Sequence, residues 1–313
     1  MSLEVELVNW LKENLSTDEH CMVGLGDDAA VLNPSHSAIV VTTDMLTDGV
    51  DFQLDRVDPR LIGHKALGVN LSDLAAMAAE PMTVFVSLVL PRETTGCCSP
   101  LELAKEIYRG MLPLAKSYGV SIAGGDTNSW EGSLVISITA LGKISPRGAL
   151  TRAGAKTGDQ LLVTGNLGGS ILGRHLQVQP RIREALLLHQ QYDIHAAIDI
   201  SDGLALDAHR LAEASECGVE LVLENVPISA DAHRLSEVSG KSALDHALGD
   251  GEDFELLLAV PPNEAERLLA TEPLAVPLTR IGEFVHSRGL WKVESNGTRT
   301  VLTPTGYQHE AMK

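Results

Sequence analysis

Cysteine, aromatic residues and basic residues are all scarce in this sequence. Its four cysteines, Cys21, Cys97, Cys98 and Cys217, include no pair with the spacing of a zinc or redox site. So few unpatterned cysteines suit a reducing compartment, and we expect a cytoplasmic protein. The 24 Lys and Arg residues against 42 Asp and Glu residues give a formal net charge of −18. Such a surface repels a phosphate backbone, which argues against nucleic acid as a partner.

Long apolar runs and the common phosphate-binding motifs are also missing. No stretch approaches the roughly 20 apolar residues of a membrane span, so we expect no membrane partner. The opening segment, MSLEVELVNWLKENL, is acidic and amphipathic, unlike a secretory signal. The sequence contains neither G-x-x-x-x-G-K-[ST] nor G-x-G-x-x-G, so a nucleotide would have to be held by other means.

The pattern of apolar residues predicts a mixed α/β or α+β fold, because both halves alternate strands with helices. The segment 145–160 is rich in Gly and basic residues and poor in large apolar ones. We interpret it as a boundary between domains at 1–145 and 146–313. We expect helices at 3–15, 59–80, 101–118, 170–176, 181–189, 204–215 and 263–270, and strands at 22–25, 38–43, 82–90, 120–123, 134–144, 161–164, 196–200, 219–223 and 254–260, followed by short strands after 278.

Acidic residues recur where apolar runs end. Any single instance is explained by a turn, since Asp and Gly favour turns. Another acid, Asp73, lies inside an apolar helix with Asn70 on the same face, and Lys65 two turns earlier is a possible partner. The acids after apolar runs are Asp27 and Asp28 in VGLGDD, Asp44 in IVVTTD, Asp126 in SIAGGDT, Asp199 and Asp202 in AIDISDG, and Asp250, Glu252 and Asp253 in ALGDGED.

These acids together indicate a cation site, because carboxylates that converge at strand ends repel one another unless a cation neutralises them. The neighbouring donors Thr42, Thr43, Ser201 and Asn70 are also oxygen ligands, whereas His and Cys are absent from the motifs. Oxygen-only sets favour Mg²⁺ or Ca²⁺, and the missing EF-hand spacing favours Mg²⁺. Bound Mg²⁺ makes an acidic pocket locally positive, so such a site between the domains can accept ATP.

Two glycine clusters are further candidates for phosphate binding. Gly124 and Gly125 precede Asp126, and two glycines allow a close approach of the backbone to a ligand. The segment TGNLGGS at 164–170 either presents amides to a phosphate or forms a tight turn into a helix.

The motifs, in their order along the chain, resemble the thiamine-monophosphate kinase family. The resemblance rests on GLGDDAAVL, VTTDMLTDGVDF, HKALGVNLSDLAAMAAEP, AGGDT, ALTRAGAKTGD, TGNLGGS, IDISDGLALD, GDGEDFEL and GYQH. It implies the fold of aminoimidazole ribonucleotide synthetase and its relatives, with an α/β C-terminal domain. It also implies a homodimer in which N-terminal sheets from two subunits form a barrel. The implied reaction is ATP-dependent phosphorylation of thiamine monophosphate to thiamine diphosphate, with several Mg²⁺ ions.

The resemblance also implies roles for individual residues. One departure concerns Asp51 in DGVDF, where the family usually has a His that faces the substrate. The implied metal ligands are Asp27, Asp28, Thr42, Thr43, Asp44, Asp73, Asp126, Asp199 and Asp202; the ATP contacts are Gly125, Asp126, Arg152 and Ser201; the substrate contacts are Asp51, Glu252 and Tyr307; and the catalytic residues are Asp44, Asp73, Asp126 and Asp202.

The charge of the reactants predicts direct, in-line transfer without a phosphoenzyme. A phosphate monoester has a second pKa of about 6, so the acceptor is already nucleophilic at neutral pH, and the cations counter the repulsion between the two anions. Three alternatives stay open. The first is another enzyme of the superfamily with a different acceptor, an alternative that Asp51 supports. The second is a non-catalytic nucleotide- or Mg²⁺-binding protein, and the third is a metal-dependent phosphatase.

Overall fold

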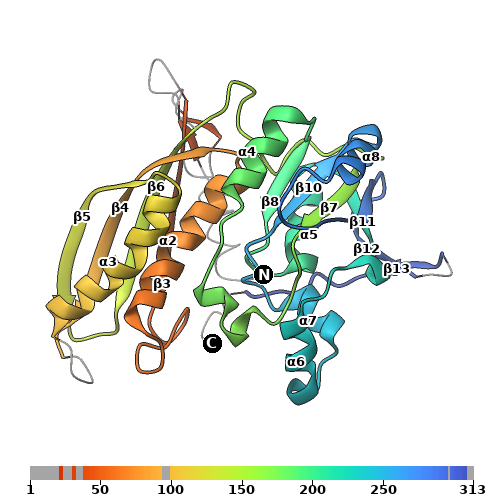
Figure 1. The fold of residues 1–313 in the computed structure, drawn as a ribbon. Helices are drawn as coiled ribbons and strands as arrows, with labels where there is room; N and C mark the ends of the chain where they lie inside the picture. The colour runs from red at the N-terminus through yellow and green to blue at the C-terminus, as the bar shows by residue number, and fades with distance from the viewer. Residues whose placement is uncertain (1–20, 24–29, 33–37, 94–98, 295–296, 309–313) are drawn as a thin grey trace, which may run out of the picture.

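The computed structural model describes residues 21–23, 30–32, 38–93, 99–294 and 297–308. Two β-sheets lie side by side with helix α2 between them (Figure 1). The helix expected at 3–15 and the candidate ligands Asp27 and Asp28 lie outside the described residues. No helix within the described ranges is long and apolar enough to cross a membrane.

The first sheet has six strands, and its neighbours pair antiparallel except for β4 and β5, which are parallel. Helices α2 (Pro59–Ala76) and α3 (Pro100–Ser117) pack against it. Along β6 the side chains of Ile136, Ile138 and Ala140 are buried, and the residues between them are partly exposed, as the alternation of a strand requires. The strand order is β1 (Cys21–Val23), β2 (Ala30–Leu32), β3 (Ile39–Thr47), β6 (Val135–Lys143), β4 (Glu80–Pro91) and β5 (Ser121–Trp130).

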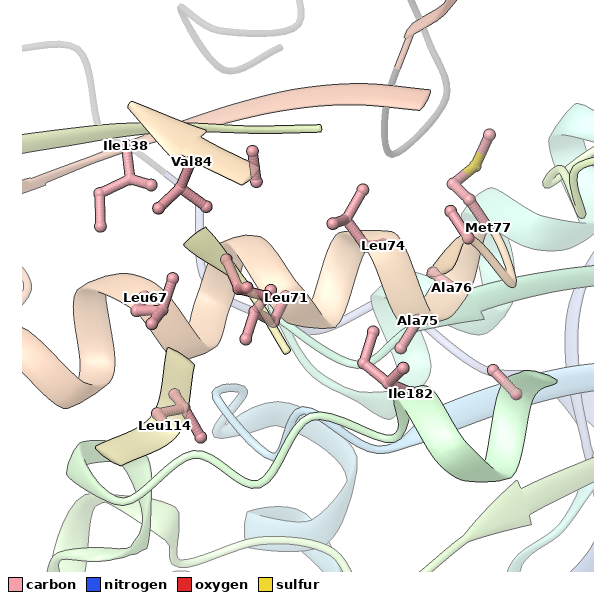
Figure 2. Packing of buried hydrophobic residues seen from close by; sticks show 14 of the residues in the cluster. Leu67, Leu71, Leu74, Ala75, Ala76, Met77, Val84, Leu114, Ile138 and Ile182 are labelled. Atoms are coloured by element: carbon pink, nitrogen blue, oxygen red, sulfur yellow. The ribbon is translucent and has the colours of Figure 1, made fainter. Parts of the chain in front are cut away.

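Helix α2 is buried on several sides. Asp58 caps its start by accepting a hydrogen bond from the backbone N of Arg60 at 2.9 Å, and Pro59 takes the first-turn position that tolerates proline. Leu67, Leu71 and Leu74 point toward the first sheet, where Val84 and Ile138 lie, while Ala75 lies beside Ile182 of helix α4 (Figure 2). A helix that is apolar on most faces belongs between two layers, and α2 occupies that place.

The second sheet has seven strands, antiparallel except where β9 pairs parallel with β12. Its order is β13 (Arg299–Val301), β12 (Gly289–Val293), β9 (Gly218–Val222), β11 (Leu278–Val285), β7 (Gln160–Thr164), β10 (Leu256–Val260) and β8 (Ala196–Asp199). The helices of this half are α4 (Ile182–Gln191), α5 (Leu204–Ala214), α6 (Ala230–Ser239), α7 (Ala243–Gly249) and α8 (Pro262–Thr271), with 3₁₀ turns η1 (Ser170–Leu172), η2 (Arg174–Leu176) and η3 (Leu223–Asn225). The predicted mixed α/β architecture is confirmed.

Two expected strand ends were wrong. Strand β3 pairs with β6 from Ile39 through Thr47, so Asp44 lies inside the strand. Strand β5 pairs with β4 through Trp130, so Asp126 also lies within its strand. The long ladders of backbone hydrogen bonds outweigh the turn preference of Gly and Asp at these positions.

The helical prediction also failed in two places. The segment 170–176 forms two 3₁₀ turns because Gly169 and Gly173, with φ of 70° and 129°, interrupt it. Helices α6 and α7 occupy 230–249, where the sequence analysis assigned nothing. Both helices are short, with Ser229 and Ser242 as their N-caps.

Candidate active site

Polar side chains of α2 reach the first sheet beside its core. Asp73 accepts a hydrogen bond from Thr42 Oγ1 at 2.5 Å. One turn earlier, the side-chain oxygen of the buried Asn70 accepts from the backbone N of Asp44 at 3.2 Å. The helix therefore brings together three predicted metal donors, Thr42, Asp44 and Asp73, and Thr42 takes the place beside Asp73 that we considered for Lys65.

The same helix reaches the second sheet through Ser72. Its hydroxyl donates to a carboxylate oxygen of Asp199 at 2.5 Å, and both residues are buried. Asp199 is the last residue of β8, so this contact joins the two halves of the molecule. Ser72 precedes Asp73 directly, so neighbouring residues of α2 contact the two halves of the molecule.

Lys65 forms a second connection between the halves. Its side chain is only 1% exposed, and its ammonium donates to the backbone carbonyl of Asp51 at 2.6 Å and pairs with Glu252 Oε1 at 2.5 Å. The Asp51 carboxylate accepts from the backbone N of Thr47 at 2.7 Å and thereby closes the turn after β3. This turn-closing role accommodates the acid at position 51.

The three predicted acceptor contacts lie close to one another. Desolvation raises the pKa of the Tyr307 phenol, and the negative charges of Asp51, Asp202 and Glu252 raise it further. The backbone N of Tyr307 also donates to the Asp202 carbonyl at 2.8 Å. The C-terminal segment thus brings Tyr307 to the region where Asp51 and Glu252 are held by Lys65.

Asp202 belongs to a charged network at the start of α5. Arg210 donates to the carboxylates of Asp202 and, at 2.9 Å, Asp207. Burial, reinforced by the charge of Asp202, raises the pKa of Asp207 to about 7. The charge of Arg152 lowers that pKa in turn, which places this predicted ATP contact at the same network.

The predicted ATP contact Ser201 lies next to this network along the chain. Its carbonyl accepts from the backbone N of Glu252 at 2.7 Å. Gly251, at φ 74°, leaves no room for a side chain, since a Cβ there would lie 2.7 Å from the Ser201 carbonyl oxygen. The loop with Glu252 is therefore packed directly on the segment with Ser201.

Other predicted residues lie apart from the α2 donors. Thr43 is exposed and points to the face of the sheet opposite to Thr42, where its hydroxyl accepts from that of Thr139 at 3.2 Å. Asp126 is exposed on β5, and it accepts from the backbone N of Thr127. A Cβ at Gly125 would lie 1.7 Å from the Val86 carbonyl oxygen, so this glycine permits close pairing with β4.

The TGNLGGS segment is a turn whose amides meet protein carboxylates. The backbone N of Gly168 donates to both Asp253 oxygens, at 3.0 and 2.9 Å, and that of Gly169 donates to Asp250 at 3.1 Å. Burial raises the pKa of Asp253 to about 7, while Arg174 acts in the opposite direction. The structure therefore favours a tight turn over a phosphate-binding loop for this segment.

Within the described ranges, no group of three or more His, Cys, Asp or Glu side chains is gathered closely enough to hold a metal ion. The oxygen donors around α2 instead come as Thr, Asn, Ser and single carboxylates. This composition fits Mg²⁺, which usually takes one or two carboxylates and keeps several waters.

Four supporting residues were missed or misjudged in the sequence analysis: Lys65, Ser72, Asp207 and Arg210. A signal existed for the first two, because Lys and Ser inside an apolar helix need partners when buried. Asp207 and Arg210 lie three residues apart on α5, a spacing typical of surface ion pairs, so the burial of Asp207 was hidden.

Known proteins match most of this chain. Two family models match, AIR synthase related protein N-terminal domain at 26–144 and AIR synthase related protein C-terminal domain at 140–291. The thiamine-monophosphate kinase of Rhodopirellula baltica is 45% identical over 295 residues, which cover 92% of this chain and 91% of the relative. The chain belongs to the thiamine-monophosphate kinase family.

Other members of the thiamine-monophosphate kinase family match along most of their length. The Escherichia coli K12 kinase is 35% identical, with 92% of each chain covered. A solved structure of AaThiL complexed with AMPPCP and TMP has a TM-score of 0.84 at 28% identity and covers 98% of this chain and 96% of its own. The E. coli hydrogenase maturation protein HypE, at 22% identity and a TM-score of 0.71 with 96% and 98% covered, shares the fold.

Proposed function

We propose that this protein transfers the γ-phosphoryl group of ATP to the phosphate of thiamine monophosphate, giving thiamine diphosphate and ADP. The observation that carries the proposal is the 45% identity to a thiamine-monophosphate kinase along nearly the whole chain. The similar AaThiL structure binds AMPPCP, an analogue of ATP, together with TMP. The oxygen donors that contact α2, and the acceptor contacts near Lys65, are the residues to which we assign the same pair of ligands.

The reaction depends mainly on how the two substrates are positioned. The acceptor phosphate is largely dianionic at neutral pH, since its second pKa is about 6, and an oxygen of it attacks the γ-phosphorus directly. The new P–O bond forms as the bond to the β-phosphate oxygen breaks and ADP leaves. No base is needed, so the protein contributes by holding the reacting atoms in line and by reducing the repulsion between two anions.

We assign Mg²⁺ to the oxygen donors of the site. Bound Mg²⁺ supplies positive charge beside the phosphates of both substrates. Asp73 on α2, together with Asp44 and Asp199, which contact α2 through Asn70 and Ser72, would be the first candidates to hold it, with Thr42 hydrogen-bonded to Asp73. Thr43, Asp126 and Asp202 are candidates for further ions, as are Asp27 and Asp28 outside the described residues.

We assign the nucleotide to Gly125, Asp126, Arg152 and Ser201, and the acceptor to Asp51, Glu252 and Tyr307. The acceptor carries a cationic thiazolium, and the charges of Asp51, Asp202 and Glu252 around Tyr307 suit it. Asp44, Asp73, Asp126 and Asp202 are the proposed catalytic carboxylates.

We further propose that the protein acts as a homodimer formed through residues 1–145, with 146–313 as the C-terminal α/β domain. The face of the first sheet opposite to α2 exposes apolar side chains: Met45 is 64% exposed and Phe85 is 42% exposed. Two such faces can cover each other. Light scattering at micromolar concentration should give the mass of two chains, and a single-chain mass would contradict the dimer.

An acceptor screen tests the proposed reaction. The purified protein with ATP and Mg²⁺ should form ADP when thiamine monophosphate is added, with an equal amount of thiamine diphosphate detected by chromatography. Thiamine and unrelated phosphate monoesters serve as comparison acceptors. Equal ADP formation with all of them, or ADP formation without any acceptor, would contradict the proposal.

A further inference from the structure

Burial of the Lys65 ammonium group costs free energy of folding. Lys65 lies on α2 with 1% of its side chain exposed, and an apolar side chain of similar length would avoid the desolvation of an ammonium group. A buried charge persists where it has well-placed partners. Lys65 has two, the carbonyl of Asp51 and the carboxylate of Glu252, and they come from opposite halves of the molecule.

Both partners belong to segments with little freedom of their own. The carboxylate of Asp51 already closes its turn on the backbone N of Thr47. Glu252 has a left-handed backbone, with φ of 53°, and its N–H is committed to the Ser201 carbonyl. A residue other than Gly adopts this conformation only when its surroundings hold it there. Lys65 binds the side chain of Glu252 and thus fixes the one part of the residue that its backbone leaves free to rotate.

We propose that Lys65 is the positioning residue of the acceptor site. It holds the Glu252 carboxylate and the Asp51 turn in one arrangement, so that the cationic thiazolium ring of the acceptor meets a preformed surface. The proposal rests on the proposed function. Preorganisation lowers the entropic cost of ordering side chains on binding, so loss of Lys65 should weaken acceptor binding more than nucleotide binding.

The test is a comparison of Michaelis constants for Lys65→Met, which keeps the apolar stem and removes the ammonium. We expect KM for thiamine monophosphate to rise roughly tenfold or more while KM for ATP stays within about twofold, the pattern of a lost acceptor contact. Lys65→Arg, which keeps a cation, should recover part of the loss. Lys116→Met, an exposed lysine near the end of α3, is the matched control and should behave as wild type.

A double-mutant cycle with Glu252→Gln separates positioning from general packing. If Lys65 acts through Glu252, the change Lys65→Met should add little in the Glu252→Gln background, since coupled residues are not additive. Equal rises in both KM values, or fully additive effects, would overturn the inference. Should Lys65→Met fail to fold, Glu252→Gln alone decides, because an unchanged KM for thiamine monophosphate in that variant would overturn it as well. An inactive wild-type protein would defeat the proposed function and this inference with it, whereas an active wild type with an unchanged Lys65→Met defeats the inference alone.

Discussion

Helices α2 and α3 have the same length and similar N-terminal caps, but they are buried to different extents. Each has 18 residues, each begins at a proline after a capping side chain, and both pack on the first sheet. Twelve residues of α2 are buried, against six of α3. At the surface, Lys105 of α3 pairs with Glu102 of the same helix, and Glu106 pairs with Arg60 at the start of α2. Lys65, Asn70 and Ser72 of α2 are buried instead, and they pair with strands and loops of both halves. A polar side chain in a buried helix therefore marks a connection, and here the connections converge on the proposed site.

The largest expected effect follows from removing the charge of Asp73 on α2. Asp73→Asn keeps the size of the side chain but weakens the proposed Mg²⁺ site, so kcat should fall by about 100-fold or more. Glu106→Gln on α3 is the matched control and should keep wild-type turnover. Steady-state assays of both variants make the comparison, and similar rates for the two would contradict the role given to α2.

The contact between the two helices can be broken at Gly63. A Cβ there would lie 1.9 Å from the Ile107 carbonyl oxygen of α3, so Gly63→Ala should push the helices apart. We expect a loss of about 3 kcal/mol in the free energy of unfolding, the upper end for overpacked sites, because the clash is with backbone. Gly119→Ala is not a suitable control, because Gly119 has a φ of 68° and alanine is strained in that left-handed conformation. Ala104→Gly on the partly exposed side of α3 is preferable, with an expected loss of about 1 kcal/mol from helix propensity. Urea denaturation measures both changes, and equal losses would argue against tight α2–α3 contact.

A buried acid should give stability a pH dependence opposite to that of a surface acid. Burial raises the pKa of Asp253 from 3.8 to about 7, so its protonated form is favoured in the folded protein. Its contribution is complete below the unfolded pKa and is lost as the pH rises toward 7. Asp253→Asn should therefore flatten the decline in unfolding free energy between about pH 4 and pH 7. Urea titrations across that range provide the measurement; an unchanged slope would be inconsistent with a titrating Asp253.

The link between α2 and the second sheet can be weakened at Ser72. Ser72→Ala removes the hydroxyl that donates to buried Asp199, and losing such a partner costs about 1–3 kcal/mol. Ser117→Ala on α3, which removes a bond to the Leu114 carbonyl near the helix end, should cost less. Guanidinium denaturation of the two variants ranks the contacts, and a larger loss at Ser117 would reverse the comparison.

The smallest effect is expected on the exposed side of α3. Hydrogen bonding from Arg60, together with Arg109, lowers the pKa of Glu106, so its contribution to stability is present at neutral pH and lost in acid. Glu106→Gln should leave the melting temperature at pH 7 almost unchanged, because exposed ion pairs contribute little. Calorimetry of both variants at pH 7 gives the values, and a shift in melting temperature as large as that of Ser72→Ala would contradict the small contribution expected of the Glu106 ion pairs with Arg60 and Arg109.

Elements with a local signal are predictable from the sequence, whereas elements whose extent depends on pairing between distant segments are not. The apolar run that includes Leu67, Leu71 and Leu74 predicts a helix because its periodicity lies within one segment. The extent of β3 and β5 depends instead on their ladders with β6 and β4, so Asp44 and Asp126 were placed beyond strands that contain them. The order of strands in the two sheets has no local signal.

The same limit applies to the site. The motifs indicated the acids, and the structure shows how three of them meet α2: Asp73 lies on it and accepts from Thr42, the backbone of Asp44 donates to Asn70, and Asp199 accepts from Ser72. The partner of Lys65 was not predictable, because Glu252 is distant in sequence and its left-handed backbone is set by contacts with Ser201. Tertiary contacts of this kind decide which polar residues of a helix are buried and paired.

The most direct test follows the phosphoryl group itself. The protein is incubated with Mg²⁺, thiamine monophosphate and ATP radiolabelled in its γ-phosphate, and the products and the denatured protein are separated. Direct transfer predicts that the label appears in the terminal phosphate of thiamine diphosphate, in equal amount to the ADP formed, and not on the protein. Label released only as inorganic phosphate, or held on the protein and later passed to thiamine monophosphate, would contradict it.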